Sequence, residues 1–303
     1  MTDVPLPLRS FRPQTLIHGL LLALVAFLAF GPTRAHASAS LGLRSYAALV
    51  VDRDTGETLI DKNADVVVPI ASLTKLMTAL VVLESHPAMD ETLEVTSDDL
   101  DREKHTYSRV GVGTRLSRSN MLLLALMSSE NRAAMALSRA YPGGRPAFIA
   151  RMNAKARELG MNSTHFADPA GLSDATTSTA RDLLRLMNAA NAQPLIRHDS
   201  THEQETVLVR GRSMHFVNTN RMVRNSHDWT IELQKTGFTN EAGRCLVMRA
   251  NTLDRRLSMV FLNSSGTLTR FADARRVREQ LARHRIGQPR PATAVATSIK
   301  GNS

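Results

Sequence analysis

Ser72 and Lys75, in the run IASLTKLMTAL, have the spacing of a nucleophile and its base. Residues three positions apart share one face of a helix, close enough for a neutral amine to take the hydroxyl proton. Because an exposed lysine is protonated at neutral pH, this chemistry needs a Lys75 pKa lowered by burial or by a second cation. A Ser and a Lys at this spacing arise by chance roughly once in such a chain. A helix-capping Ser72 beside a solvated Lys75 is therefore the alternative.

Two further motifs follow along the chain. Residues 129–131 (SEN) lie between two predicted helices, where a hydroxyl and an amide can both point into a cleft. Residues 235–237 (KTG) follow a strand predicted over residues 231–234, and the glycine lets another backbone approach the strand edge closely. A specified tripeptide occurs by chance in fewer than about one in ten chains of this length. The motifs in this order predict a serine nucleophile in a cleft.

The sequence resembles the low-molecular-mass penicillin-binding proteins, which are serine-type D-alanyl-D-alanine peptidases with Ser-x-x-Lys, Ser-x-Asn and Lys-Thr-Gly motifs. The likeness extends to LLLALMSSENRAA, LGMNSTHFADPAGLS and LQKTGFTNEAGRCLVM, and it is nearest to the D-alanyl-D-alanine endopeptidase branch. Glu130 stands where class A β-lactamases have Asp, and HFADPAGL replaces their deacylating glutamate region. We expect neither the β-rich domain nor the membrane anchor that larger carboxypeptidases append.

The resemblance implies a role for each residue of the first two motifs. Ser72 attacks a D-alanyl carbonyl and Lys75 takes its proton, giving an acyl-enzyme that water later releases. Ser129 relays a proton to the leaving amine, and Asn131 hydrogen-bonds the substrate amide and helps to place Lys75.

The resemblance also implies how the third motif binds substrate. Lys235 attracts a substrate carboxylate and lowers the pKa of Lys75, and Thr236 contacts the same carboxylate. Gly237 allows the close approach, and the backbone N–H groups of Ser72 and Phe238 form the oxyanion hole. Loss of one such donor typically costs about 3 kcal/mol of transition-state stabilisation.

The order of elements predicts an α+β domain. A turn sequence at residues 54–57 predicts a hairpin over 44–61, and apolar residues at helical spacing predict a central helix over 71–84. Further helices are predicted over 119–127, 132–141, 146–159, 179–190 and 271–283, and further strands over 207–210, 231–234, 245–249 and 257–262. Strands at both ends of a helical middle predict an antiparallel sheet flanked by helices, beside a mainly helical lobe. The resemblance implies the penicillin-binding transpeptidase and β-lactamase-like form of this architecture.

Residues 1–37 have the features of a secretory signal. Arg9 and Arg12 precede an apolar run, and Ala35 and Ala37 supply the small residues that a signal peptidase reads. The run at residues 20–30 is shorter than the roughly 20 residues of a spanning helix. We therefore expect a periplasmic mature chain with a peptidase domain over 38–285, a disordered tail over 286–303 and no firm membrane anchor.

Composition narrows the partners. Lys and Arg number 38 against 28 Asp and Glu, but the charges are interspersed. Three Tyr and one Trp offer little for base stacking, so no nucleic-acid partner is expected. Cys245 is the only cysteine, which excludes an internal disulfide; a small buried strand residue is favoured over a reactive thiol.

The sequence offers few features for functions other than a serine peptidase. His198 and His202 are four residues apart, but no Glu directly follows His198 as in the metalloprotease motif, so residues 198–203 are interpreted as a polar turn. No metal or cofactor is expected. A non-catalytic binder of peptidoglycan or β-lactams would not need the Ser72 and Lys75 pair, and a β-lactamase is a further alternative.

We therefore expect an endopeptidase that cuts D-alanyl to diaminopimelyl cross-links and is acylated by penicillins. Its partners would be peptidoglycan peptide stems and β-lactams. The main alternative is a carboxypeptidase that trims pentapeptide stems, because both activities use the same motifs.

Overall fold

The computed structural model describes residues 41–225, 227–283 and 286–287, which belong to the compact unit 40–303. The predicted signal, residues 1–37, lies outside the described residues, as does the predicted tail except residues 286 and 287. The boundaries drawn at residues 38 and 285 stay predictions. In the described part of the chain, no helix is long and apolar enough to cross a membrane.

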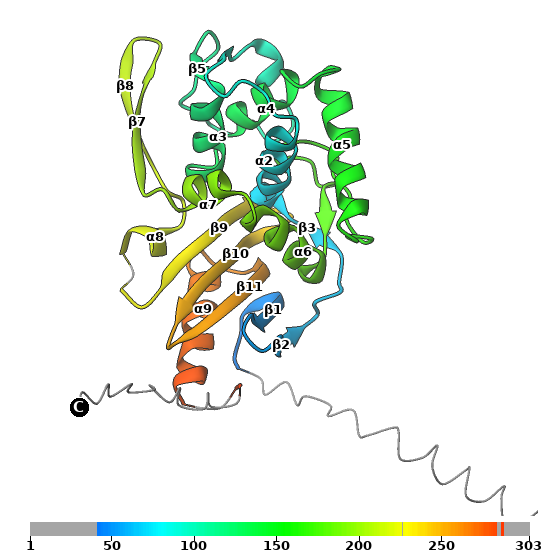
Figure 1. The fold of residues 1–303 in the computed structure, drawn as a ribbon, viewed down its shortest axis with the longest axis vertical. Helices are drawn as coiled ribbons and strands as arrows, with labels where there is room; N and C mark the ends of the chain where they lie inside the picture. The colour runs from blue at the N-terminus through cyan, green and yellow to red at the C-terminus, as the bar shows by residue number, and fades with distance from the viewer. Residues whose placement is uncertain (1–40, 226, 284–285, 288–303) are drawn as a thin grey trace, which may run out of the picture. The chain divides into compact units, whose positions relative to one another are not determined.

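A five-stranded antiparallel sheet joins the two ends of the described chain in the order β2-β1-β11-β10-β9 (Figure 1). Its strands are β1 (Ser45–Asp52), β2 (Thr58–Lys62), β9 (Thr230–Thr239), β10 (Gly243–Thr252) and β11 (Arg255–Ser264). Strand β11 returns to pair with β1, with Ala48 opposite Phe261. The predicted hairpin and the return of the carboxyl-terminal strands onto it are therefore confirmed.

Side chains alternate between the two faces of the sheet, so each face has its own core. Val260 and Leu262 belong to the larger core, which includes helix α6, whereas Met259 and Phe261 pack with helix α9. The helices are α2 (Lys75–Glu84), α3 (Arg118–Met127), α4 (Asn131–Arg139), α5 (Gly144–Glu158), α6 (Ala180–Asn191), α7 (Pro194–Thr201), α8 (Arg221–Asn225) and α9 (Thr269–Ala282), with short 3₁₀ turns η1 (Ala71–Thr74) and η2 (Ser97–Asp99). The expected α+β class, a sheet flanked by helices beside a helical lobe, is confirmed.

Helix α2 is the central helix of the helical lobe, as its apolar sequence predicts. Every residue from Lys75 to Val82 is buried, and α2 packs against α3, α4, α5 and α6 (Figure 1). A helix in this position can carry a polar side chain only where neighbouring elements supply hydrogen-bond partners, because an unpaired buried polar group is costly.

Three short two-stranded sheets complete the structure. They pair β3 (Val68–Pro69) with β6 (Thr177–Ser178), β4 (Thr92–Glu94) with β5 (Arg115–Ser117), and β7 (Gln204–Val209) with β8 (Arg212–Val217). The predicted strand over residues 207–210 thus begins earlier and has a partner, β8, that the sequence pattern did not indicate. The polar turn expected from residue 198 was wrong as far as Thr201, because Pro194 begins α7 and both Asp199 and Ser200 are buried in it.

Candidate active site

Ser72 lies in the 3₁₀ turn η1, directly before α2, at the junction of the sheet and the helical lobe. Neither η1 nor α2 has a side-chain cap at its amino end, so Ser72 does not act as a helix cap. Its neighbour Ala71 has a left-handed backbone, φ 47°, which is unusual for a residue with a Cβ. The Ser72 hydroxyl is therefore free of a structural role in the backbone of this helix.

Lys75 is fully buried at the first turn of α2, so the solvated interpretation was wrong. Its Nζ donates to Ser72 Oγ, Asn131 Oδ1 and the carbonyl oxygen of Ala170, each at 2.7 Å. An ammonium has three donors, and all are matched. The hydroxyl of Ser72 is thus held within hydrogen-bond reach of an amine whose position is fixed from two other segments.

The Lys75 pKa is lowered to about 7, chiefly because burial disfavours the charged ammonium. The carboxylates of Asp168, Glu130 and Asp101 oppose this shift. The expectation that Lys235 lowers the Lys75 pKa is thus replaced by burial as the dominant cause. A neutral amine is accessible near pH 7, as a general base requires.

Lys235 is also fully buried, and its Nζ lies 2.9 Å from Ser129 Oγ. The same Nζ donates to the carbonyl oxygen of Thr236 at 2.9 Å. Burial and the charge of Lys75 both lower the pKa of Lys235 well below its usual value. Ser129, at φ 61° between α3 and α4, therefore faces a lysine as Ser72 does.

The third motif lies inside strand β9, which continues to Thr239 instead of ending before Lys235 as predicted. This strand is an edge of the sheet, and Gly237 brings that edge against η1. A Cβ on Gly237 would lie 3.0 Å from the carbonyl oxygen of Ile70 and 3.2 Å from the nitrogen of Ser72. The predicted close approach at this glycine is confirmed, and the nucleophile's backbone N–H lies beside the strand.

A pocket of about 310 Å³ joins these segments. Its lining includes the predicted residues Ser72, Ser129, Asn131, Thr236, Gly237 and Phe238, and the unpredicted residues Thr219, Arg244 and Arg270. Lys75 and Lys235 are buried behind this lining and touch it through the two serines. All predicted site residues are thus brought together around one cavity.

Thr219 and Arg270 were missed because no local pattern marks them. Thr219 follows β8, and its hydroxyl lies 2.7 Å from the hydroxyl of Thr236. Arg270 lies in the first turn of α9 and is only 6% exposed, yet its Nε is buried without a hydrogen-bond partner. Burial and the charge of Arg244 lower the pKa of Arg270 to about 10. These residues give one wall of the pocket a positive character.

Asp168 is a further unpredicted residue, and it shapes the loop that contacts Lys75. Its carboxylate accepts hydrogen bonds from four consecutive backbone N–H groups and from the Thr176 hydroxyl, at 2.6 to 3.1 Å; the N–H donors are those of Ala170, Gly171, Leu172 and Ser173. The loop so held directs the Ala170 carbonyl at Lys75 and the Pro169 carbonyl at Thr78, at 2.7 and 2.5 Å. Asp168 is therefore a positioning residue for the base.

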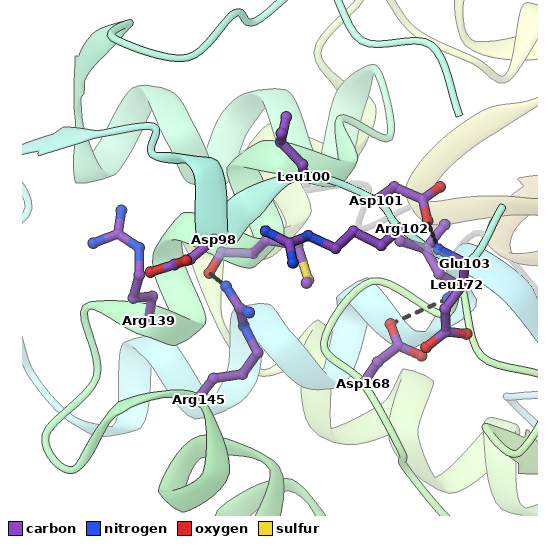
Figure 2. Close-up of a pocket in the computed structure, with 10 residues that line it drawn as sticks. Asp98, Leu100, Asp101, Arg102, Glu103, Arg139, Arg145, Asp168 and Leu172 are labelled. Atoms are coloured by element: carbon purple, nitrogen blue, oxygen red, sulfur yellow. Dashed lines mark hydrogen bonds between the residues drawn. The ribbon is translucent and has the colours of Figure 1, made fainter. Parts of the chain in front are cut away.

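A second hollow, of about 440 Å³, has Asp168 and Leu172 in its lining. Figure 2 shows Asp168 and Leu172 at one end of this hollow and Arg139 and Arg145 at the other. Both arginines pair with the fully buried carboxylate of Asp99, at 2.9 and 3.0 Å. Their charge is used within the fold, and the hollow adds no group to the reacting atoms.

Glu130, the middle residue of the second motif, makes hydrogen bonds that stabilise the fold. Its carboxylate accepts from the Ser108 hydroxyl at 2.5 Å and from the backbone N–H of Arg132, where it caps α4. Burial raises its pKa. The Glu130 side chain connects α4 to the loop that carries Ser108, so this residue stabilises the start of the helix.

The histidine pair weighed as a metal site differs in context from the prediction. His198 lies in α7 and bonds Asp199 at 2.9 Å, and its ring centroid is 5.3 Å from that of His202. Among the described residues, no group of three His, Cys, Asp or Glu is arranged to hold a metal ion.

Comparison with known proteins agrees with this geometry. The family model described as D-alanyl-D-alanine carboxypeptidase matches residues 33–266. A D-alanyl-D-alanine endopeptidase of Pseudomonas aeruginosa is 50% identical over 79% of this chain and 77% of its own length. The D-alanyl-D-alanine endopeptidase of Escherichia coli is 45% identical over 85% of this chain and 83% of its own length.

Solved structures give the same result. The Streptomyces K15 DD-transpeptidase superposes with a TM-score of 0.71 at 27% identity, covering 78% of this chain and 95% of that one. Penicillin-binding protein D2 from Listeria monocytogenes, in its cefotaxime-bound form, superposes with a TM-score of 0.69 at 28% identity, covering 78% of this chain and 96% of that one. The motifs, the fold and the sequence relatives converge: the chain belongs to the D-alanyl-D-alanine carboxypeptidase family of serine peptidases.

Proposed function

We propose that this chain is a serine-type D-alanyl-D-alanine endopeptidase that hydrolyses D-alanyl to diaminopimelyl cross-links of peptidoglycan. The observation that carries the proposal is the 2.7 Å separation of Lys75 Nζ from Ser72 Oγ, with Lys75 fully buried. A lysine whose pKa is about 7 can act as a base at neutral pH. The names of the two similar endopeptidases favour cross-link cleavage.

In the acylation step, Ser72 Oγ attacks the carbonyl carbon of the D-alanyl residue while its proton passes to Lys75 Nζ. The carbonyl oxygen becomes an oxyanion, for which the backbone N–H groups of Ser72 and Phe238 are the proposed donors. The close approach of β9 to η1 supports this pairing, since a Cβ on Gly237 would lie 3.2 Å from the Ser72 nitrogen. Such preorganised donors are worth about 3 kcal/mol each.

Collapse of the tetrahedral intermediate breaks the carbon–nitrogen bond, and the leaving amine takes a proton. Ser129 is the proposed donor, because its Oγ lies 2.9 Å from Lys235 Nζ, which can replace the proton. The product is an ester on Ser72. Lys75 then loses to solvent the proton that it took from Ser72, and Lys235 regains one. Water attacks the ester while the neutral Lys75 takes its proton, and collapse of the intermediate returns that proton to Ser72 Oγ and releases the D-alanyl carboxylate.

Substrate recognition is assigned to the positive wall of the pocket. A carboxylate next to the scissile amide would meet Thr236 and Arg270, with Lys235 behind them. The unpartnered Nε of Arg270 supports this assignment, since a buried guanidinium nitrogen favours an anionic acceptor. Asn131 Nδ2 donates to Thr106 while its Oδ1 accepts from Lys75, so Asn131 holds the base as well as lining the pocket.

The partners and location follow from the same proposal. A penicillin presents a strained amide carbonyl and a carboxylate, so it would acylate Ser72 in place of a peptide stem. Peptidoglycan stems are the proposed natural partners. With residues 1–37 as an export signal, the mature chain would act in the periplasm as a peptidase domain over 38–285.

The test uses the exported chain and a Ser72→Ala variant with a cross-linked muropeptide dimer and, separately, a monomeric pentapeptide. Monomers released from the dimer by the wild-type chain alone are the expected result. Absence of any Ser72-dependent product, from a chain that still folds, would refute the catalytic proposal. Stable labelling by a fluorescent penicillin, again dependent on Ser72, would separate a peptidase from a β-lactamase, which turns the drug over.

Carboxypeptidase activity is the second candidate, favoured by the description of the family model. It uses the same nucleophile and base, and its leaving group is a single D-alanine. Release of D-alanine from the pentapeptide without cleavage of the dimer would select this activity.

A further inference from the structure

The lining of the pocket contains two guanidinium groups, those of Arg244 and Arg270, and in the proposed binding mode they lie on the side of the leaving group. Within the described part of the chain, neither forms an ion pair with a carboxylate. Unpaired like charges on one wall raise the free energy of the empty pocket, and an anion relieves it. One carboxylate of the substrate has been assigned to Arg270 above.

Arg244 occupies a different depth from Arg270. Arg270 is 6% exposed, whereas Arg244 is half-buried on β10, directly opposite Phe238 in the strand register. The Arg244 guanidinium lies 4.2 Å above the centre of the Phe238 ring, and the Phe238 residue is 51% exposed. The pair forms a cationic, flat surface at the rim, next to the strand residues that hold the scissile amide.

The two candidate reactions differ only on this side of the scissile bond. A carboxypeptidase releases D-alanine, which has one carboxylate. An endopeptidase releases a whole stem, whose diaminopimelyl residue has a carboxylate beside the scissile nitrogen and whose peptide ends in a second carboxylate farther away. The first carboxylate is common to both leaving groups, and the second is found only in the cross-linked stem.

We propose that Arg244 and Phe238 form an acceptor-stem subsite, in which Arg244 binds the second, terminal carboxylate of the cross-linked stem. This inference rests on the proposed endopeptidase function and names the part of the protein that selects the longer leaving group. The aromatic face of Phe238 holds the guanidinium plane in place, so little side-chain entropy is lost when the carboxylate binds. The rim position lets the rest of the stem stay in solvent.

The test compares matched substrates. Two cross-linked dimers are prepared that differ only at the end of the acceptor stem, which is a free carboxylate in one and a carboxamide in the other. For the wild-type chain we expect kcat/KM to be about tenfold higher for the carboxylate, the size of one charge-assisted hydrogen bond at a partly exposed site. In Arg244→Gln the ratio falls to about one, and Arg244→Lys keeps part of it.

The ratio within each variant removes any general effect of the substitution on Phe238 or on folding, because both substrates meet the same enzyme. Arg157→Gln, on the exposed end of α5, is the matched control and keeps the wild-type ratio. Equal rates on the two dimers with the wild-type chain, or an unchanged ratio in Arg244→Gln, would overturn the subsite but not the endopeptidase. No cleavage of either dimer by a wild-type chain that still takes up penicillin would overturn both proposals.

Discussion

Asp168→Asn tests whether the loop carboxylate controls the base. Asn keeps one carbonyl oxygen, which can still accept the N–H groups that bond Oδ1, those of Ala170, Gly171 and Leu172. Its amide nitrogen then faces the N–H of Ser173, which loses its acceptor, while the Thr176 hydroxyl can turn to accept. We expect a loss of about 2 to 3 kcal/mol in the free energy of unfolding, from one orphaned buried N–H and weaker neutral hydrogen bonds.

The same change acts on Lys75 through charge. Asp168 is the largest of the influences that raise the Lys75 pKa against the effect of burial. Removing its negative charge leaves burial less opposed, so the Lys75 pKa falls from its value of about 7. The neutral amine is the reactive form, so the rate of acylation rises with pH through that pKa and levels above it. In Asp168→Asn the rising limb therefore moves to lower pH.

The assay measures the second-order rate constant of penicillin acylation by stopped flow between about pH 5 and pH 9, a range that brackets the Lys75 pKa. This rate constant reports the ionisation of groups in the free enzyme. Urea unfolding followed by circular dichroism gives the stability. Asp174→Asn is the matched control, because Asp174 lies in the same loop but pairs with Lys104 at the surface, at 2.9 Å. In the control, the rising limb of the pH–rate profile should stay at the wild-type pH, and the free energy of unfolding should fall by at most about 1 kcal/mol. A limb in Asp168→Asn that stays in place or moves to higher pH would refute the electrostatic reasoning.

Two other predictions concern packing, one at Gly237 in the site and one at Cys245 in the core of the sheet. Gly237→Ala places a methyl group 3.0 Å from the Ile70 carbonyl, so β9 must move by a few tenths of an ångström and penicillin acylation should slow about tenfold. The control is Gly111→Ala, whose Cβ meets only Arg210, at 3.5 Å. Equal acylation rates in the two variants would contradict the prediction. Cys245 is fully buried and burial raises its thiol pKa to about 11, so a thiol reagent at pH 8 (about three pH units lower) should label the unfolded chain and leave the native chain unmodified. Labelling of the native chain at the unfolded rate would show that the thiol is accessible.

The parts of the fold with strong apolar periodicity were predictable from sequence. Strands β1, β10 and β11 and helix α2 bury most of their residues, so their apolar patterns are clear, and the turn sequence at residues 54–57 marks the hairpin that β1 forms with β2. Strand β8 was not predictable, because its residues are mostly exposed and its pairing with β7 is made by the backbone. Strand β9 was predicted too short because its buried Lys235 and Thr236 look like loop residues in sequence.

The residues of the site also fall into a group that was predictable from sequence and a group that was not. Ser72, Lys75, Ser129 and Lys235 belong to motifs that are rare in combination, so their types and order carried the prediction. Asp168, Thr219 and Arg270 reach the site only through tertiary structure; Asp168 lies in the run HFADPAGL, which carries part of the family likeness, but that run does not indicate which of its residues holds the loop against Lys75. The Ala170 carbonyl that fixes Lys75 is 95 residues away along the chain. Sequence can therefore indicate which residues react, but not which residues hold them in place.

Backbone strain connects the residues that react with the residues that hold them in place. Ala71 and Ser129, next to the nucleophile and at the second serine, both have positive φ, at 47° and 61°, and such a conformation costs about 1 to 3 kcal/mol for a residue with a Cβ. The local chain cannot supply this energy, so tertiary contacts must. Gly171 packs so closely on the Ala71 carbonyl that a Cβ there would lie 1.9 Å from its oxygen, and the Thr74 hydroxyl donates to the same oxygen at 2.7 Å. The loop shaped by Asp168 thus holds both the base and the strained turn that presents the nucleophile, and this is why the surrounding fold decides whether the Ser72 and Lys75 pair is reactive.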